Sequence, residues 1–600
     1  MRGSSALFYK RLLSFNASRL SVVAVVALGL GLSACGKSVG AKPKPIRKFP
    51  VAEDPIPQEN NENGARPNGD DTPQNIVRQD WFNLDPELDG IEGLGANRIY
   101  NEILVNGREK DLAPIIVAVI DSGVDINHED LKNKIWTNPG ETGLDAAGKD
   151  KASNGIDDDN NGYVDDIHGW NYIGGYDAEG KPVSIGPETL EKTRIYKKLQ
   201  DKLDSGLALT EEEQALYDKT KKEVTEEKAA AVEELAVLNP ALAEIEEAYP
   251  AVAALLGDKP VEALTRDEVA ALESNDSTVN AAKDKIVAAL DRTGFTSVAR
   301  LMRFIELDNE SVEYYYNPDF NPRAQIVGDN PDDFSDVGYG NNDVMGVDAD
   351  HGTHVSGMIA AERGNGIGID GVANSALIMS LRAVPNGDER DKDVALAIRY
   401  AADNGAQVIN MSFGKQYSPN RAEVQEAIEY AEAKGLLLVH AAGNDGKNTT
   451  EILNDNFPTP NKIGDEGRVN SWVEVGAASS KKDANLPAVF SNFGNESVDI
   501  FAQGVRVEST IPGNQYAIFS GTSMASPAFA GAAALIWSMK PDLTAAEVKE
   551  LLLENGRTYD GLMVNIPSET GPIGQTLFAN LSITGKVANA LSTMLALLEM

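Results

Sequence analysis

Three short segments of the 600-residue sequence carry a carboxylate, an imidazole and a hydroxyl group that could act together. They contain Asp121 in Val-Ile-Asp-Ser-Gly, His351 in His-Gly-Thr-His, and Ser523 in Gly-Thr-Ser-Met-Ala-Ser-Pro. A serine hydroxyl is a weak nucleophile at its ordinary pKa, so it needs a base within hydrogen-bond reach and a third group that orients the base. The order Asp, His, Ser is one of three unrelated orders in which an acyl-transfer triad occurs. The three segments therefore predict serine peptidase chemistry.

These segments and their order resemble those of the subtilases, the subtilisin-like serine endopeptidases. The resemblance covers roughly residues 81–175 and 343–591. It implies that Ser523 is the nucleophile, His351 the general base, and Asp121 the residue that orients the imidazole and stabilises its cation. It also implies that the substrates are proteins or peptides, whose peptide bonds are hydrolysed through an acyl-enzyme.

The segment Ala-Ala-Gly-Asn at 441–444 resembles the oxyanion loop of this family. On this resemblance, the Asn444 side chain and the Ser523 backbone N–H donate hydrogen bonds to the oxyanion that develops during acyl transfer. An asparagine here, together with a histidine base, separates the subtilases from their sedolisin relatives, which use an acidic residue in each role. The sequence therefore predicts activity at neutral or alkaline pH.

A second resemblance concerns substrate binding. Ser412, Phe413 and Gly414 resemble the extended edge that pairs with the substrate backbone by β-augmentation. Gly443 is expected on the opposite wall of the primary specificity pocket. Phe413 is bulkier than the small or branched residues often found at its position, and it does not by itself define which substrate side chain is preferred.

The segment 154–166 matches most of an EF-hand-like loop for calcium. Oxygen ligands occupy alternate positions from one to nine, the seventh through a backbone carbonyl: Asp157, Asp159, Asn161, Tyr163 and Asp165. Position twelve holds His168 in place of the bidentate glutamate, so we expect weaker affinity or a last ligand from Asp166, Asp158 or elsewhere. Subtilases resembling this one often carry such a loop after the aspartate motif. An acidic turn without a metal ion is the alternative.

Residues 1–34 predict a bacterial export signal. Basic residues are followed by an apolar run of about thirteen residues, which is shorter than the roughly 20 that a membrane-spanning helix needs. The run ends in Leu-Ser-Ala-Cys, which resembles the bacterial lipobox and implies lipidation of Cys35, the only cysteine. An ordinary signal peptide with a chance cysteine is the alternative. Gly36 follows the cysteine, whereas an aspartate there would, by resemblance to enterobacterial lipoproteins, suggest retention in the inner membrane, so we expect the outer membrane. The composition of residues 35–80 is typical of a disordered tether.

Four apolar runs predict strands buried in a parallel sheet: 115–120, 376–381, 407–410 and 436–440. Helical patterns at 394–404 and 421–434 lie between them, and each is followed by a glycine suited to a helix C-terminus. This alternation predicts an α/β protein, and the resemblance implies a three-layer subtilisin-like fold with a central, mainly parallel sheet flanked by helices. Asp121, Ser412 and Asn444 fall at or just after strand ends, where such sheets bind ligands.

Residues 187–306 differ in composition from the rest of the chain. They are rich in Ala, Glu, Lys and Leu, and they contain capping-box patterns that begin at Thr210 and Thr265. We expect an all-helical insertion between two parts of the peptidase domain, 81–186 and 307–600. Such an insertion could gate substrates or dock a partner. The lack of catalytic residue types favours a solvated decoration beside the core.

The formal net charge of −38 argues against a nucleic-acid partner and for a soluble catalytic domain. The sequence as a whole predicts a lipid-anchored serine endopeptidase of the bacterial cell envelope that binds calcium. Two alternatives belong to other classes: a catalytically silent scaffold that presents the insertion to an envelope partner, and a calcium-dependent adhesin. The intact triad favours the enzyme.

Overall fold

The computed structural model describes residues 80–105, 108–450, 469–568, 571 and 573–600. The predicted export signal, Cys35 and nearly all of the predicted tether lie outside the described residues. None of the helices in the described part of the chain has the length and apolar character needed to cross a bilayer.

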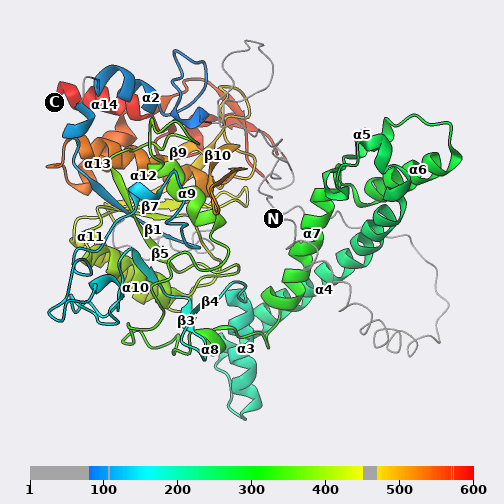
Figure 1. The fold of residues 1–600 in the computed structure, drawn as a ribbon, viewed down its shortest axis with the longest axis horizontal. Helices are drawn as coiled ribbons and strands as arrows, with labels where there is room; N and C mark the ends of the chain where they lie inside the picture. The colour runs from blue at the N-terminus through cyan, green and yellow to red at the C-terminus, as the bar shows by residue number, and fades with distance from the viewer. Residues whose placement is uncertain (1–79, 106–107, 451–468, 569–570, 572) are drawn as a thin grey trace. The chain divides into compact units, whose positions relative to one another are not determined.

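A nine-stranded sheet forms the centre of the protein (Figure 1). Its neighbouring strands are parallel, except for the two strands at one edge, β12 (Arg557–Thr558) and β15 (Lys586–Val587), which are antiparallel. The order across the sheet is β12, β15, β9 (Ile500–Gln503), β8 (Trp472–Ala478), β7 (Leu437–Ala441), β6 (Val408–Met411), β1 (Ile115–Asp121), β5 (Ala376–Arg382) and β2 (Gly169–Asn171).

Helices cover both faces of this sheet. Alternate residues of β1 belong to two separate cores, since side chains of a strand point alternately to opposite faces. Val117 and Val119 pack with α9 (Asp350–Ala360), α12 (Thr522–Met539), α13 (Ala545–Glu554) and α14 (Ala590–Glu599). Ala118 and Ile120 pack with α10 (Asp391–Asp403) and α11 (Arg421–Ala433). Figure 1 shows these two sets of helices on either side of the strands. The predicted three-layer α/β fold is confirmed.

Shorter elements complete this body. Three two-stranded sheets pair in antiparallel fashion: β3 (Gly174–Tyr176) with β4 (Pro182–Ser184), β10 (Val507–Ile511) with β11 (Gln515–Phe519), and β13 (Met563–Asn565) with β14 (Gln575–Leu577). The short helices α2 (Ala96–Arg98) and α8 (Arg323–Ile326) lie outside the main layers.

The segment predicted as an insertion is helical. Its helices are α3 (Glu191–Asp204), α4 (Glu211–Ala248), α5 (Arg266–Ala270), α6 (Ser277–Thr293) and α7 (Val298–Glu310). Thr210 and Glu213 form both bonds of a capping box at the start of α4. Apolar residues of α4, α6 and α7 make a core of their own. Helix α7 ends beyond residue 306, and a π-helical turn, Ser311–Tyr315, follows it.

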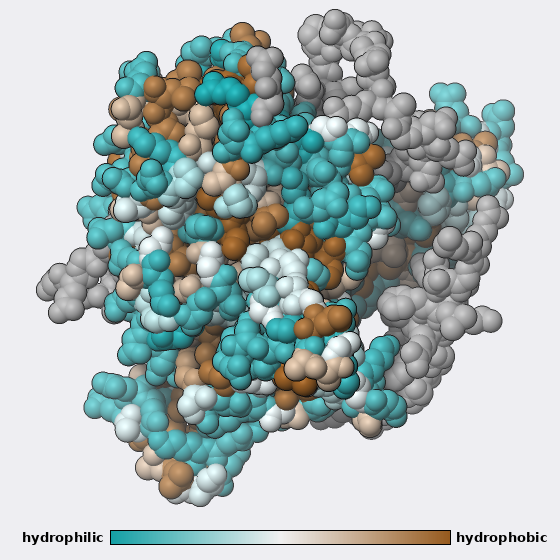
Figure 2. All heavy atoms as spheres, turned by 60° about the vertical axis from the view of Figure 1, so that its left-hand side comes forward, coloured by the Kyte–Doolittle hydropathy of each residue, from teal (hydrophilic) through white to brown (hydrophobic). Residues whose placement is uncertain are grey.

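Figure 2 shows one face of the molecule coloured by hydropathy. Hydrophilic residues cover much of this face, and the hydrophobic patches between them are small and separated. This surface agrees with the strongly negative net charge of the chain.

Candidate active site

Asp121 and His351 meet where β1 ends and α9 begins. The Nδ1 atom of His351 lies 2.7 Å from Oδ1 of Asp121, which also accepts a hydrogen bond of 2.7 Å from the Ser122 backbone N–H. A carboxylate can only accept, so Nδ1 carries the proton and Nε2 is left as the acceptor. The Asp121 side chain is 2% exposed, whereas 37% of the imidazole is exposed. The pair therefore presents a basic nitrogen at the surface.

The electrostatics of this pair favour the imidazolium. Burial opposes a charge on His351, but the charge and the hydrogen bond of Asp121 outweigh it, so the pKa of His351 lies above its ordinary value of 6.5. A general base with a carboxylate behind it holds a proton more readily once it has taken one.

Two glycines let the backbones of the Asp121 and His351 segments approach closely. A Cβ atom on Gly352 would lie 2.2 Å from the carbonyl oxygen of Gly123 and 3.1 Å from Cβ of Asp121. Gly123 itself has φ of +113°, in the range that favours glycine. Both residues belong to the segments that first indicated catalysis, and here they have a steric role.

Ser523 lies in the first turn of α12, the helix that packs against α9 in the main core. Its hydroxyl is half-buried and donates to the carbonyl oxygen of Ser412 at 3.1 Å. Among the contacts of the described residues, this hydroxyl is bonded to Ser412 and not to His351. A serine side chain has three staggered positions about χ1, so rotation alone re-aims the oxygen. Catalytic hydrogen bonds often form only in the substrate complex.

The neighbouring hydroxyl, Ser526, is buried and donates to Oδ1 of Asn410 at 2.5 Å. Asn410 in turn donates to Oγ of Ser412, which donates to the backbone carbonyl of Ser523 at 3.0 Å. This chain of bonds fastens the end of β6 to the start of α12. Ser526 is occupied in packing, which leaves Ser523 as the accessible hydroxyl of the segment.

The Asn444 side chain is bonded to the start of α12, one residue before Ser523. Oδ1 of Asn444 accepts bonds from the backbone N–H and the hydroxyl of Thr522, at 2.8 and 3.0 Å, which fixes the orientation of the amide. A Cβ built on Gly521 would lie 3.5 Å from the Ser523 nitrogen and 3.7 Å from both Nδ2 and Oδ1 of Asn444, so the Asn444 amide and the Ser523 backbone lie next to each other. Gly443 joins the same cluster by donating to the Thr522 hydroxyl at 3.1 Å. The arrangement offers two donors to one developing negative charge.

The segment after β6 borders the nucleophile. Ser412 contacts Ser523 directly, and Phe413 is partly buried against the α10 and α11 core. The carbonyl oxygen of Phe413 accepts a bond of 2.7 Å from Nε2 of His440, whose Nδ1 lies 3.0 Å from Glu474. The sequence does not indicate this contact of His440 and Glu474 with the Phe413 backbone, because each residue lies in a strand pattern that is otherwise apolar or small.

The other four histidines are engaged elsewhere. His354 is buried, its Nε2 lies 3.1 Å from two backbone carbonyl oxygens, and it stacks on Phe519. Burial, followed by the charge of His351, lowers the pKa of His354 to about 3. His128 and His168 contact backbone carbonyl oxygens, and His440 contacts Glu474. His351 is therefore the histidine that the fold pairs with Asp121.

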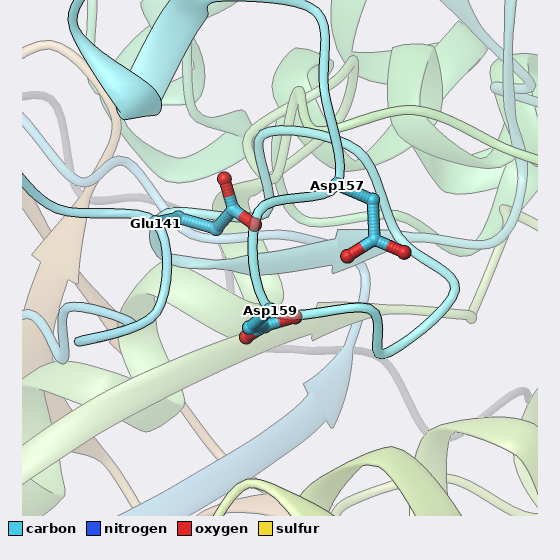
Figure 3. Close-up of side chains that lie close together, drawn as sticks. All are labelled: Glu141, Asp157 and Asp159. Atoms are coloured by element: carbon cyan, nitrogen blue, oxygen red, sulfur yellow. The ribbon is translucent and has the colours of Figure 1, made fainter. Parts of the chain in front are cut away.

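A cluster of three carboxylates lies in the loops that follow β1 in the chain (Figure 3). Metal-binding oxygens of Glu141, Asp157 and Asp159 lie within 4.8 Å of one another. Glu141 is fully buried; one of its oxygens accepts from the Asp158 backbone N–H at 2.8 Å, and the other has no hydrogen-bond partner. Gly140 permits the close approach, because a Cβ there would lie 2.4 Å from Asp159. A buried carboxylate oxygen without a donor fits a site completed by a cation.

The structure groups two of the five predicted calcium ligands, Asp157 and Asp159, with Glu141. All of these side chains also accept backbone hydrogen bonds: Asp157 accepts from Gly162 at 2.9 Å, and the side-chain oxygen of Asn161 accepts from Tyr163 at 2.8 Å. The Asp165 carboxylate accepts from the Gly155 backbone N–H at 3.0 and 3.1 Å.

The two substitutes considered for the last ligand are also engaged. Asp166 accepts bonds from Asn138, Asn161 and Tyr400. Asp158 accepts from Asn154 and lies 3.8 Å from Lys151. Glu141 was missed because it precedes the loop by more than a dozen residues, and only the fold brings it there.

Comparison with known proteins agrees with this geometry. The model of the subtilase family matches residues 113–567. Subtilisin NAT of Bacillus subtilis subsp. natto is 31% identical over 322 residues, which are 52% of this chain and 76% of that protein. A thermophilic serine proteinase of Bacillus sp. (strain AK1) is 42% identical over 207 residues, which are 34% of this chain but 46% of that relative, so the match spans less than half of its length.

Among solved structures, a structure of a subtilase cytotoxin is 25% identical in sequence to this chain. The match covers 42% of this chain and 77% of the cytotoxin chain, with a TM-score of 0.34. The family match spans most of the chain and contains Asp121, His351, Asn444 and Ser523. The chain therefore belongs to the subtilase family of serine endopeptidases.

Proposed function

We propose that this protein is a lipid-anchored serine endopeptidase of the bacterial cell envelope that hydrolyses peptide bonds through an acyl-enzyme. The observation that carries the catalytic part is the 2.7 Å contact between His351 and the buried carboxylate of Asp121. It orients a base whose free nitrogen points outward, next to the helix that carries Ser523.

In the proposed reaction, the Ser523 hydroxyl turns from Ser412 toward Nε2 of His351 and attacks the substrate carbonyl carbon. Its proton passes to Nε2, while Asp121 stabilises the imidazolium. Nδ2 of Asn444 and the N–H of Ser523 donate to the oxyanion. His351 then gives the proton to the leaving amine, and the carbon–nitrogen bond breaks. A water molecule then attacks the acyl carbon while His351 takes its proton. His351 returns that proton to Oγ of Ser523 as the ester bond breaks, which releases the acid and restores the serine.

Calcium is the proposed structural ion at Glu141, Asp157 and Asp159. Hard carboxylate oxygens are the ligands that calcium prefers, and three of them carry enough charge for a divalent cation. The ion would supply a positive charge that joins the loop containing Glu141 to the loop containing Asp157 and Asp159. It would lie in the scaffold and would take no part in bond breaking.

Anchoring and location rest on the sequence of residues 1–35, with Cys35 as the lipidated residue. The test is a comparison of wild-type and Cys35→Ser protein expressed in a bacterial host, by partition of cell lysate between detergent and aqueous phases. Wild-type protein is expected in the detergent phase and the variant in the aqueous phase. Equal partition of the two would contradict the anchor.

The catalytic proposal is tested by labelling with a fluorophosphonate probe and by cleavage of casein. Wild-type protein should react with the probe, and Ser523→Ala should neither react nor cleave while keeping its circular dichroism spectrum. Ser526→Ala is the matched control, because it removes the neighbouring buried hydroxyl and should still react with the probe. An unlabelled wild-type protein would support the silent scaffold instead.

A further inference from the structure

The helical insertion is bonded to the segment that borders the nucleophile. That segment comprises residues 412–417 and is called the 412–417 segment below. It begins with Ser412, whose carbonyl oxygen accepts from the Ser523 hydroxyl, and it leaves the end of β6. In the sheet, β6 and β5 lie on either side of β1, which carries Asp121. The segments that follow β5 and β6 therefore both border the site where an acyl group binds.

Lys415 is the first link to the insertion. Its ammonium is fully buried and lies 2.9 Å from the Glu191 carboxylate on α3 and 2.6 Å from Asp391. It also donates to the backbone carbonyl of Glu389 at 2.9 Å. Burial disfavours the ammonium, yet Glu191 and Asp391 outweigh burial and raise the pKa of Lys415. Lys415 is therefore a buried cation, and breaking one side of such a pair leaves an uncompensated charge.

Glu191 is held on the insertion side. Arg194, one turn along α3, lies 2.5 Å from the same carboxylate. Burial of Glu191 opposes its charge, but Arg194 and Lys415 together keep its pKa below the ordinary value. A second contact lies further along, where the Tyr417 hydroxyl donates to Glu223 of α4 at 2.8 Å. Two helices of the insertion thus contact the 412–417 segment at two points.

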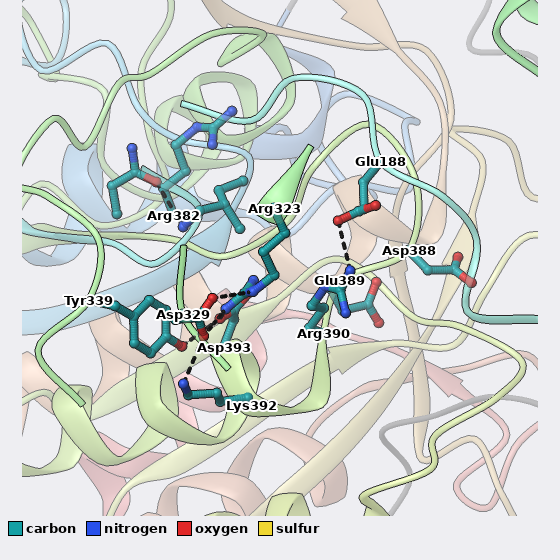
Figure 4. Close-up of polar contacts among 12 residues, drawn as sticks. Glu188, Arg323, Asp329, Tyr339, Arg382, Asp388, Glu389, Arg390, Lys392 and Asp393 are labelled. Atoms are coloured by element: carbon teal, nitrogen blue, oxygen red, sulfur yellow. Dashed lines mark hydrogen bonds and ion pairs between the residues drawn. The ribbon is translucent and has the colours of Figure 1, made fainter. Parts of the chain in front are cut away.

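The insertion also contacts the segment that follows β5. Backbone bonds of 2.9 Å join Glu188 to Asn386 and Asn386 to Gly186. A Cβ on Gly387 would lie 2.3 Å from the Glu188 carbonyl oxygen, so the two backbones are in contact. Figure 4 shows the Glu188 carboxylate directed at Arg390, at 3.1 Å, beside Asp388 and Glu389. Both segments that border the site are therefore fixed to the base of the insertion.

We propose that the insertion is a positioning element for substrate: Glu191, through Lys415, holds the backbone of the 412–417 segment in the conformation that pairs with an extended peptide. This inference rests on the proposed function. The substrate class that it favours is a chain long enough to lie along that backbone, because β-augmentation uses main-chain hydrogen bonds over several residues. His440 holds Phe413 from the opposite side, so the segment is clamped between the sheet and the insertion.

The test compares two substrates with wild-type protein and Glu191→Gln. The long substrate is the tetrapeptide anilide succinyl-Ala-Ala-Pro-Phe-p-nitroanilide, and the short one is acetyl-tyrosine ethyl ester. Glu191→Gln should lower kcat/KM for the tetrapeptide about 10-fold, mainly through KM, since misplaced binding groups weaken positioning. The ester should change less than about 2-fold, because it meets the segment only at the primary specificity pocket and does not extend further along it. Equal losses on both substrates, or no loss on the tetrapeptide, would overturn the proposal.

Two further variants keep the result interpretable. Glu247→Gln is the matched control, since it removes an exposed ion pair with Lys285 on the same insertion, 2.6 Å in length, and should leave both substrates unaffected. Tyr417→Phe removes only the hydroxyl that reaches Glu223, and it carries the test if Glu191→Gln does not fold. It should show a smaller loss with the same dependence on substrate length.

Hydrogen exchange separates this proposal from the catalytic one. Amides of Phe413–Tyr417 should exchange faster in Glu191→Gln than in wild type or Glu247→Gln, whether or not the protein hydrolyses anything. Failure of wild-type protein to react with fluorophosphonate contradicts the catalytic proposal alone. Unchanged exchange in the 412–417 segment contradicts the positioning role, even in an active enzyme.

Discussion

Asn444 accepts two hydrogen bonds from Thr522, one from its backbone N–H at 2.8 Å and one from its hydroxyl at 3.0 Å. Both come from the residue that immediately precedes the nucleophile. The amide oxygen is thereby occupied, which leaves the amide nitrogen of Asn444, close to the Ser523 backbone, as the free donor of this side chain. If Asn444 is an oxyanion donor, as we propose, its orientation is fixed before any substrate arrives, which is the condition for strong electrostatic catalysis.

Asn444→Ala should lower kcat by about 10² to 10³, the effect expected for the loss of one oxyanion donor, with a small change in KM. Steady-state kinetics on a peptide anilide measures this. Thr522→Val keeps the asparagine but removes the hydroxyl that orients it, and should cost about 10-fold, the worth of one hydrogen bond. A kcat for Asn444→Ala equal to that of wild type would remove this residue from the mechanism.

The pH dependence of activity should follow His351. Its pKa lies above 6.5, and only the neutral imidazole acts as a base, so kcat/KM should rise with pH through a midpoint above 6.5. Asp121→Asn removes the charge that raises this pKa, so the midpoint should move to lower pH while kcat falls by about 10⁴. Asp560→Asn, an exposed substitution, is the control. A midpoint that stays in place in Asp121→Asn would contradict the assignment.

His351 affects stability and activity in opposite ways as the pH rises: its contribution to the free energy of unfolding falls, whereas activity increases. Because the folded-state pKa is raised, protonation of His351 favours the folded state. This contribution is fully present below about pH 6.5 and is lost as the pH rises through the folded-state value. The enzyme should therefore be most active where this contribution is smallest.

His354 should make the fold sensitive to acid. Its pKa falls to about 3 because the neutral ring is buried, so its contribution is present above pH 6.5 and is lost as the pH falls toward 3. The total change is roughly 3–5 kcal/mol. Melting temperatures of wild type and His354→Gln, measured from pH 7 to pH 4, test this. The variant should show the weaker dependence on pH, and parallel curves would show that other groups govern acid unfolding.

Calcium should stabilise the wild-type protein through Glu141. An ion that binds only the folded state, at about 100 times its Kd, contributes about 2.7 kcal/mol, so the melting temperature should rise on adding calcium. Glu141→Gln removes one carboxylate and should reduce that rise. Glu179→Gln, an exposed change in the same part of the domain, should keep it. Terbium luminescence gives a second readout, and equal metal affinity in all three proteins would argue against Glu141 as a ligand.

Much of the fold follows from local sequence. The strand β1 was predictable because buried parallel strands are apolar on both faces, and α4 because Thr210 and Glu213 form a capping box. The residues of the proposed triad could be chosen because their three segments resemble the subtilase motifs, and the structure adds a steric reason for the glycines in two of those segments. Gly352 is an example, with no room for a Cβ.

Other features depend on tertiary contacts that no local pattern reveals. Glu141 joins Asp157 only because two loops fold back on each other, and Lys415 meets Glu191 across more than two hundred residues. The sequence favours a solvated decoration because the insertion lacks catalytic residue types. Its charged residues lie in a helical pattern, where they are usually exposed to solvent, so nothing in the sequence indicates a buried ion pair such as Glu191 with Lys415. The buried ion pairs where the insertion meets the peptidase domain are seen only in the structure.

The proposed nucleophile, Ser523, is carried by α12, a helix whose residues are almost all buried in the main core. A peptidase is surrounded by copies of itself, and partially opened molecules are digested first. Since the start of α12 cannot loosen without exposing the centre of the protein, a molecule that has begun to melt also loses its ability to cut its neighbours. We therefore expect activity and resistance to self-digestion to be lost together when the protein is heated.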